Sequence, residues 1–201
     1  MSEPSAKEST VEKETGRLEA FSDGVMAVII TLMAFELKVP GGGGFSNLGG
    51  LVPGLLVYVL SFMFVGIYWN NHHHLLRAAT RISGSVMWLN LHLLLWLSLI
   101  PLVTEWMAAH WRDHAPAVCY AVVALGSAVA YTLLQAAIIR ADGPGSVIAD
   151  ALGSDRKGRA SLVAYLAALG LAFVSPVISY VLFALVAFMW FIPDRRLDRR
   201  R

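Results

Sequence analysis

The sequence predicts an all-α integral membrane protein with six transmembrane helices, and three observations support this fold class. First, 57% of the 201 residues are hydrophobic and only 15% are charged, a balance that the polar surface of a soluble domain cannot cover. Second, most of the apolar runs approach the roughly 20 residues needed to cross a bilayer. Third, the basic residues fall almost entirely on one side of the resulting topology.

The apolar runs set the order of the spans. They lie at 21–39, 51–69, 85–107, 116–139, 160–174 and 177–192. The last two runs are short and only Ser175 and Pro176 separate them, so we expect a tight turn between two helices; a single Pro-kinked span is the alternative. Pro101, inside the third run, predicts a kink there as well.

The basic residues also orient the chain. If the N-terminus is cytoplasmic, fourteen of the 16 Lys and Arg residues lie in cytoplasmic segments, and only Lys38 and Arg112 lie outside. Because cytoplasmic loops carry the positive excess, both termini are predicted to be cytoplasmic. We expect 1–16 to be a disordered N-terminus, 17–193 the transmembrane domain, and 194–201 a basic tail at the lipid headgroups rather than a nucleic-acid site.

Motifs of the common soluble enzymes are absent from the sequence. It contains no phosphate-binding loop and no GxSxG, HExxH or CxxC motif, so it predicts neither an enzymatic activity nor catalytic residues or a cofactor. The lone Cys119 offers no disulfide or metal framework and is interpreted as a small core residue.

Polar residues crowd the start of the first span, where apolar residues are expected. Arg17, Glu19, Ser22 and Asp23 all lie within its first turns. Charged groups at membrane depth are costly and are kept where they pair or line a water-filled path. One interpretation is a solvated, interfacial Asp23 favoured by the helix dipole, and the other is a buried polar cluster that fixes this helix against its neighbours.

A second polar concentration favours the buried cluster. The stretch "YWNNHHHLLR", 68–77, ends the second span on the same side of the membrane as Asp23. Its Trp and His rings carry N–H donors suited to a carboxylate. Asn90 and His92, in the third span, are candidates for hydrogen bonds between helices.

One face of the first span combines small, hydroxyl and apolar side chains in a regular pattern. Gly24, Val28, Thr31 and Phe35 recur at i, i+4, i+7 and i+11, and Leu32 adjoins them, so they share one stripe. A lipid-facing or core stripe is the simpler interpretation. Several copies around an axis would instead form a pore with narrow apolar rings and a hydroxyl layer.

These residues resemble a known family. The stretch "RLEAFSDGVMAVIITLM" is similar to the R-x-x-x-F-S-D-G signature that opens the first helix of the transmembrane-protein-175 family of potassium channels. The signature positions are filled by Arg17, Phe21, Ser22, Asp23 and Gly24. "YWNNHHHLL" resembles the end of that family's second helix, W-x-x-H-H-R-L-F, through Trp69, His72 and His73, whereas His74 and Leu76 depart from it.

The resemblance implies a channel permeable to potassium over sodium, without the TVGYG filter and without a cofactor other than permeant potassium ions. The absence of an internal repeat points to the prokaryotic form, a homotetramer in the lipid bilayer of the plasma membrane whose first helices line the pore. By position, Val28 would form the main constriction, Thr31 the hydroxyl layer, and Leu32 and Phe35 further apolar rings.

The same resemblance gives the polar cluster a structural role. Asp23 is expected to be the hub of a network that holds the pore helix at its cytoplasmic end, with partners on the first two helices. The residues expected there are Arg17, Phe21, Ser22, Asp23, Gly24, Trp69, His72 and His73.

Two other classes of protein stay open. A membrane-embedded metal or haem protein would use the histidines, which are His72 to His74, His92, His110 and His114. His110 and His114 stand at i, i+4 beside Glu105 and Asp113, a weak metal signature. Against this class, the histidines divide between the two membrane sides. A secondary transporter is the other alternative, although the sequence lacks broken-helix repeats and a deep charged relay.

Overall fold

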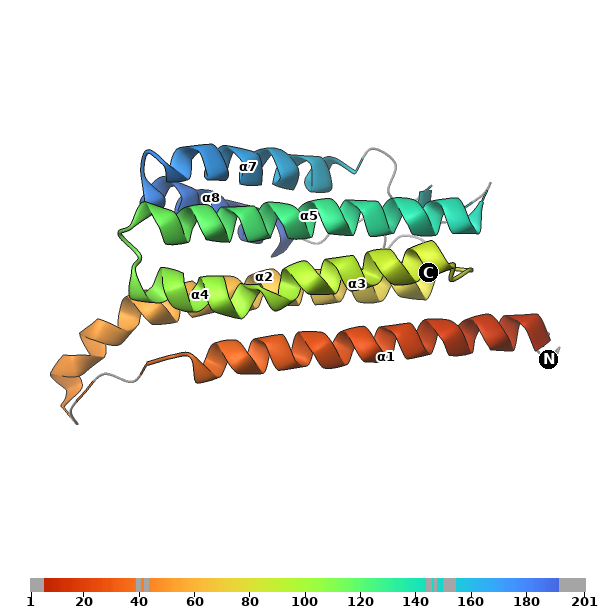
Figure 1. Ribbon diagram of the computed structural model, residues 1–201, viewed down its shortest axis with the longest axis horizontal. Helices are drawn as coiled ribbons and strands as arrows, with labels where there is room; N and C mark the ends of the chain where they lie inside the picture. Colours follow the sequence, from red (N-terminus) through yellow and green to blue (C-terminus); the bar gives the residue numbers. More distant parts are fainter. Residues whose placement is uncertain are drawn as a thin grey trace.

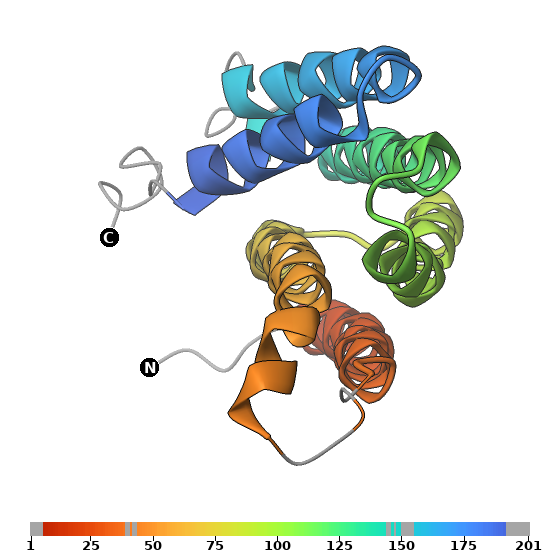
Figure 2. The same cartoon turned by 90° about the vertical axis from the view of Figure 1, so that its left-hand side faces the viewer.

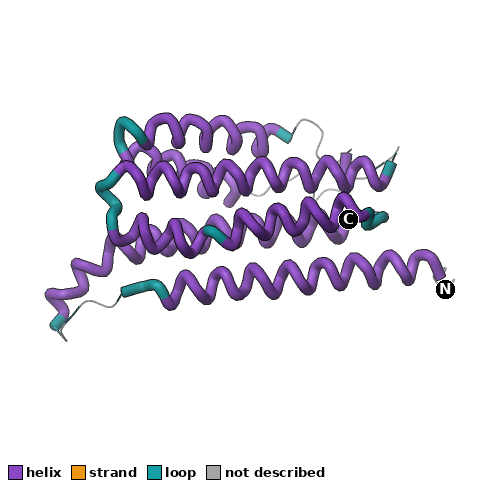
Figure 3. Tube along the Cα trace, in the orientation of Figure 1, coloured by secondary structure: helices purple, strands orange, loops and turns teal. Residues whose placement is uncertain are grey.

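The computed structural model describes residues 6–38, 41, 44–143, 146, 148–149 and 155–191, and all regular structure in these ranges is helical (Figures 1 and 3). In chain order the elements are α1 (Ala6–Phe35), the 3-10 helix η1 (Phe45–Leu51), α2 (Val52–Ala78), α3 (Gly84–Ser98), α4 (Ile100–Ala109), α5 (His114–Asp142), α7 (Arg156–Ala172) and α8 (Pro176–Phe191). Their order matches the six predicted spans, with α3 and α4 together forming the third.

Helix length separates the spans into two groups. Among the described residues, four stretches are long and apolar enough to cross a membrane, namely Glu14–Phe35, Leu48–Ala78, Gly84–Ala109 and His114–Asp142. The last two helices are shorter, with 17 residues in α7 and 16 in α8. At about 1.5 Å per residue they cover roughly 25 Å, a little less than the bilayer core.

The first helix begins earlier than the sequence predicts. Residues 6–16 were expected to be disordered, but they are continuous with the apolar part of α1, and Figure 1 shows α1 as one long rod. Ala, Lys and Glu are good helix formers, and a helix already nucleated by the spanning segment needs only to propagate. Residues 1–5 and the predicted basic tail, 194–201, lie outside the described residues.

The helices are interrupted near Pro101 and Pro176, as predicted. The third span is interrupted at Leu99, between α3 and α4, and Pro101 lies in the first turn of α4. Proline cannot donate to the carbonyl four residues earlier and its ring crowds that carbonyl, so the helix breaks just before it. A turn between α7 and α8 is likewise confirmed, because α7 ends at Ala172 and Pro176 opens α8.

The helices pack in layers with α5 in the middle. α5 contacts α3 and α4 on one side and α7 and α8 on the other, while α1 packs on α2, α3 and α4 at the far edge (Figures 1 and 2). A side chain at Gly126 of α5 would place its Cβ only 2.4 Å from the Trp96 ring of α3. Glycine at this position therefore permits the close approach of α3 and α5.

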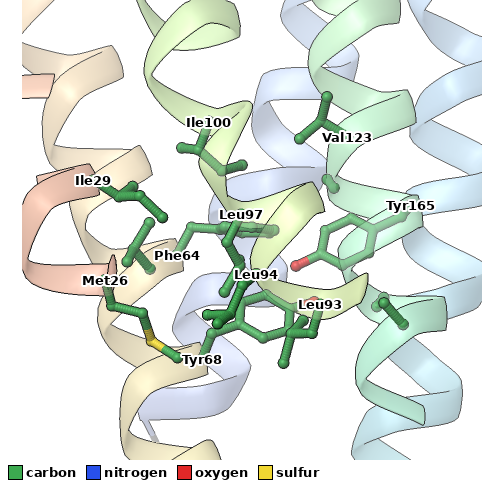
Figure 4. Close-up of a cluster of buried hydrophobic side chains, with 14 of the residues drawn as sticks. Met26, Ile29, Phe64, Tyr68, Leu93, Leu94, Leu97, Ile100, Val123 and Tyr165 are labelled. Carbon is green, nitrogen blue, oxygen red and sulfur yellow. The ribbon is translucent and has the colours of Figure 1, made fainter. Parts of the chain in front are cut away.

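The core lies between these layers. Figure 4 shows Met26 and Ile29 of α1 gathered with Phe64, Leu94 and Leu97 of α2 and α3. Burial of such side chains is worth about 1.5–3 kcal/mol each in water, but within a bilayer close packing and hydrogen bonds decide how helices associate. The polar contacts of α1 therefore help to set the position and rotation of this helix against its neighbours.

Candidate functional site

One face of α1 is closed by the rest of the chain. Ser22, Met26, Ile29 and Met33 recur at i, i+4, i+7 and i+11, and each is at most 2% exposed. They pack against the neighbouring helices α2, α3 and α4. This buried face fixes the rotation of α1 about its own axis.

The predicted stripe lies on a different face of α1, which the rest of the chain leaves exposed; we call it the open stripe. Val28 is 57% exposed, Leu32 48% and Phe35 80%, and Gly24 and Thr31 are exposed as well. From Gly24 to Phe35 the stripe is apolar apart from Thr31. A single chain therefore leaves a continuous apolar surface on its first helix, which only lipid or another protein surface can cover.

Thr31 presents an oxygen rather than a proton on this open face. Its hydroxyl donates to the Ala27 carbonyl of the preceding turn, with an Oγ1–O distance of 2.8 Å. The hydroxyl proton is thus used within the helix. The two lone pairs of Oγ1 remain available to a cation or a water molecule.

A buried chain of hydrogen bonds anchors the N-terminal half of α1 to α3 and α2. The Asn90 amide donates to Ser22 Oγ at 2.9 Å, and Ser22 donates to the Leu18 carbonyl at 2.8 Å. The amide oxygen of Asn90 accepts from His72 Nε2 at 2.7 Å, so this nitrogen carries the proton. Ser22, His72 and Asn90 are fully buried, and His72 Nδ1 has no hydrogen-bond partner among the described residues.

A second, more exposed chain joins α1 to the end of α2. Trp69 Nε1 donates to Asp23 Oδ1 at 2.9 Å. The Trp69 ring stacks on His73, with 5.9 Å between centroids and 22° between planes. His73 Nδ1 pairs with Glu19, and the Arg77 guanidinium lies 3.5 Å from His73 Nε2. A neutral His73 satisfies both contacts, because Nδ1 donates to Glu19 while Nε2 accepts from Arg77.

Five of the eight residues predicted for the network take part in these contacts, but they belong to two separate chains. Ser22 and His72 belong to the buried chain, whereas Asp23, Trp69 and His73 belong to the exposed one. Asp23 is therefore not a hub, in contrast to the prediction. Successive helical residues point about 100° apart, so Ser22 faces α3 and Asp23 faces α2.

Three of the expected members lie outside both chains. Arg17 is exposed and makes no hydrogen bond or ion pair with any described residue, Phe21 is 53% exposed, and no neighbour lies within 4 Å of a Cβ added at Gly24. Arg17 stands six residues before Asp23, which places the two about 120° apart around the helix. This angle explains why they do not meet within one chain.

Other polar contacts were predicted only in part. Asn90 of α3 is hydrogen-bonded to both α1 and α2, as expected of a contact between helices, but His92 accepts from Trp96 Nε1 of its own helix at 3.0 Å. Glu19 was not predicted as a partner, although it lies one turn before Asp23 on the same face.

A buried hydroxyl cluster was missed. Thr104 donates to Ser61 at 2.8 Å, and Ser61 is hydrogen-bonded to Tyr120 at 3.1 Å. These residues come from α4, α2 and α5. Single hydroxyls inside apolar runs carry no pattern that reveals such a cluster from sequence.

His110 and His114 do not gather with the acidic residues that were considered as metal ligands. His110 lies 3.3 Å from Asp113, whereas His114 Nδ1 contacts the Ala172 carbonyl at 2.8 Å and Glu105 pairs with Lys38. Within the part of the chain that is described, no three His, Cys, Asp or Glu side chains come close enough to hold a metal ion.

Fold and site together define an all-helical membrane protein whose first helix is anchored on one face and open on another. A model of the family described as "Endosomal/lysosomal potassium channel TMEM175" matches residues 17–101. A protein named as a potassium channel from Chryseobacterium sp. (strain P1-3) is 45% identical over 184 residues, covering 92% of this chain and 96% of the relative. The chain belongs to the TMEM175 family of ion channels.

Further relatives extend this similarity. A potassium channel from Streptomyces collinus is 38% identical over 129 residues, covering 60% of this chain and 63% of that protein. The fold also matches the crystal structure of a lysosomal potassium-selective channel TMEM175 homolog from Chamaesiphon minutus. The TM-score is 0.78 at 30% identity, covering 90% of this chain and 97% of that one.

Proposed function

We propose that this chain is the subunit of a homotetrameric cation channel in a prokaryotic plasma membrane, permeable to potassium over sodium. The first helices line its pore, no cofactor takes part, and both termini are cytoplasmic. Its relatives named as potassium channels support the class of activity.

The observation that carries the proposal is the difference between the two faces of α1. Its buried face is closed by α2, α3 and α4, while the stripe from Gly24 to Phe35 is open in the single chain. One copy cannot enclose a pore. Copies arranged about an axis place the open stripes face to face and cover them.

The constriction follows from side-chain chemistry. Four Val28 side chains would form a short apolar ring that offers an ion no replacement for its hydration shell, so conduction is limited there. Thr31 lies one turn further out, and its free lone pairs provide oxygen atoms at the next layer. Leu32 and Phe35 would add apolar rings toward the outer mouth.

The two hydrogen-bonded chains serve as an anchor rather than as reacting groups. They join the cytoplasmic half of α1 to α2 and α3, through Ser22 on one side and Asp23 on the other. This fixes the rotation and height of the helix. In a tetramer, the same anchor would set which side chains face the axis.

The test is a planar-bilayer recording of the purified protein under opposed potassium and sodium gradients. We expect single-channel currents whose reversal potential lies nearer the potassium equilibrium potential. Flux that saturates and requires a proton gradient would indicate a transporter instead. Native mass measurement should give four chains, and a stable monomer or dimer would contradict the pore.

A further inference from the structure

A groove with both polar and apolar lining residues lies between α5 and α7, away from α1. It has a volume of about 330 Å³ and is lined, among others, by Thr132, Gln135, Ala149, Asp155, Arg159 and Leu162. α5 and α7 run side by side in both views of the ribbon (Figures 1 and 2). We call this feature the α5–α7 groove.

One polar side chain in the groove has no hydrogen-bond partner among the described residues. Gln135 is only 7% exposed, and its amide makes no hydrogen bond with any described residue. It stands seven residues before the end of α5 at Asp142, about 10 Å along the helix. Among the described residues the only fully buried polar side-chain atom without a partner is His72 Nδ1, so the Gln135 amide opens onto the groove and is accessible to an occupant with polar groups.

Two opposite charges flank Gln135 and do not neutralise each other. Asp155 and Arg159 are four residues apart at the start of α7, yet neither forms an ion pair within the described ranges. Asp155 Oδ1 accepts from the Gly158 amide at 3.1 Å, which holds the carboxylate in place. The groove thus presents a carboxylate, a guanidinium and an amide to one occupant.

The level of the groove matches the lipid headgroups. In the proposed orientation the end of α5 and the start of α7 lie on the cytoplasmic side. Trp190, at the end of α8, donates to Ser161 of α7 at 2.9 Å, and the Lys157 ammonium lies 5.7 Å from its ring centre. Tryptophan beside a basic residue is typical of the membrane interface.

We propose that the α5–α7 groove binds the headgroup of an aminophospholipid of the phosphatidylethanolamine type. The phosphate would contact Arg159, and the primary ammonium would donate to Asp155 and to the Gln135 carbonyl. A phosphatidylglycerol headgroup brings no cation to Asp155. A choline headgroup has no N–H to donate, so neither satisfies the three groups together.

The test is native mass spectrometry of the full-length protein with phosphatidylethanolamine and phosphatidylcholine of identical acyl chains. We expect the ethanolamine lipid to bind about tenfold more tightly, as loss of a charge-assisted hydrogen bond implies. Equal affinity for the two lipids would overturn the proposal. Binding is read by mass, so its outcome does not depend on whether the protein conducts.

Three variants locate the site. Asp155→Asn and Gln135→Met should each reduce the preference for ethanolamine about tenfold, because they remove acceptors of the primary ammonium. Arg159→Gln removes the contact to the phosphate that both lipids carry, so it should weaken the binding of both lipids about tenfold. Asparagine also caps helices well, so Asp155→Asn removes the charge while α7 stays capped. Arg140→Gln is the matched control, because it removes a basic charge at the same end of α5 without lining the groove.

Two results would contradict the assignment of the α5–α7 groove to this lipid. Unchanged affinity for both lipids in Arg159→Gln would overturn the proposal, and because Arg159 is exposed this variant is informative even if Gln135→Met does not fold. Soluble phosphoethanolamine should not displace the lipid at equal concentration. Displacement would indicate a site for a free metabolite and would overturn the lipid assignment.

Discussion

The buried and open faces of α1 are built from similar side chains but are closed by different surfaces. The buried face combines Met26, Ile29 and Met33 with one serine that is hydrogen-bonded to α3. The open stripe combines Val28, Leu32 and Phe35 with one threonine that is hydrogen-bonded to its own helix. Hydropathy therefore does not distinguish the two faces. The face that packs inside the chain is the one whose hydroxyl, Ser22, is hydrogen-bonded to another helix.

The same difference separates the two polar chains beside α1. The Ser22–Asn90–His72 chain is fully buried, whereas Asp23 and its partners are partly exposed. A buried hydrogen bond cannot be replaced by water when one partner is removed, but an exposed one can. We therefore expect the buried chain to hold α1 more strongly than the signature residue Asp23 does.

The largest effect is expected from filling the proposed constriction. Val28→Trp should abolish single-channel current while the protein still assembles, because four indole rings cannot fit around a narrow axis. Val28→Asn should raise conductance and weaken potassium selectivity, because amides can replace part of the hydration shell. Ile29→Val, on the buried face, is the control and should cost about 1 kcal/mol of stability with conductance unchanged. The reverse pattern would show that the pore-lining face is misassigned.

Breaking the buried chain should have the next largest effect. Asn90→Leu leaves the His72 ring N–H without an acceptor and removes the donor to Ser22, so we expect a loss of roughly 1–3 kcal/mol in the free energy of unfolding. Thermal unfolding in detergent measures it. Asn70→Leu, on the exposed side of α2, is the matched control. Equal stability of the two variants would mean that the buried chain does not anchor α1.

A change at the hydroxyl layer should alter selectivity rather than assembly. Thr31→Val nearly preserves shape but removes the oxygen lone pairs, so the potassium-to-sodium permeability ratio should shift by a few-fold, or about 1 kcal/mol. Reversal potentials under mixed ions measure this ratio. Ser127→Ala also removes a hydroxyl bonded to its own helix, but in a buried position on α5, and should leave the ratio unchanged. An unaltered ratio in Thr31→Val would place this hydroxyl outside the ion path.

The smallest effects are expected at the signature charges. Asp23→Ala removes one partly exposed hydrogen bond to Trp69 and should lower the free energy of unfolding by about 1 kcal/mol. Arg17→Ala should leave the stability of the single chain unchanged, because Arg17 has no partner among the described residues. If Arg17→Ala reduces the yield of assembled protein but not the melting temperature of dissociated chains, Arg17 acts between subunits.

The sequence by itself determined the class of protein, the order of its spans and the breaks near Pro101 and Pro176. Composition, run length and proline chemistry act locally along the chain, so they can be read without neighbours. The stripe on α1 was also predictable, because helical periodicity alone places Val28, Thr31 and Phe35 on one face.

Tertiary structure alone decided how the polar residues pair. Ser22 and Asp23 are adjacent in the signature but point about 100° apart, so each meets a different helix, and Asn90 rather than Asp23 joins three helices. The Thr104, Ser61 and Tyr120 hydroxyls meet only because α4, α2 and α5 pack together. Pairings of this kind depend on the rotation and height of each helix, which are set by packing between segments distant in the chain.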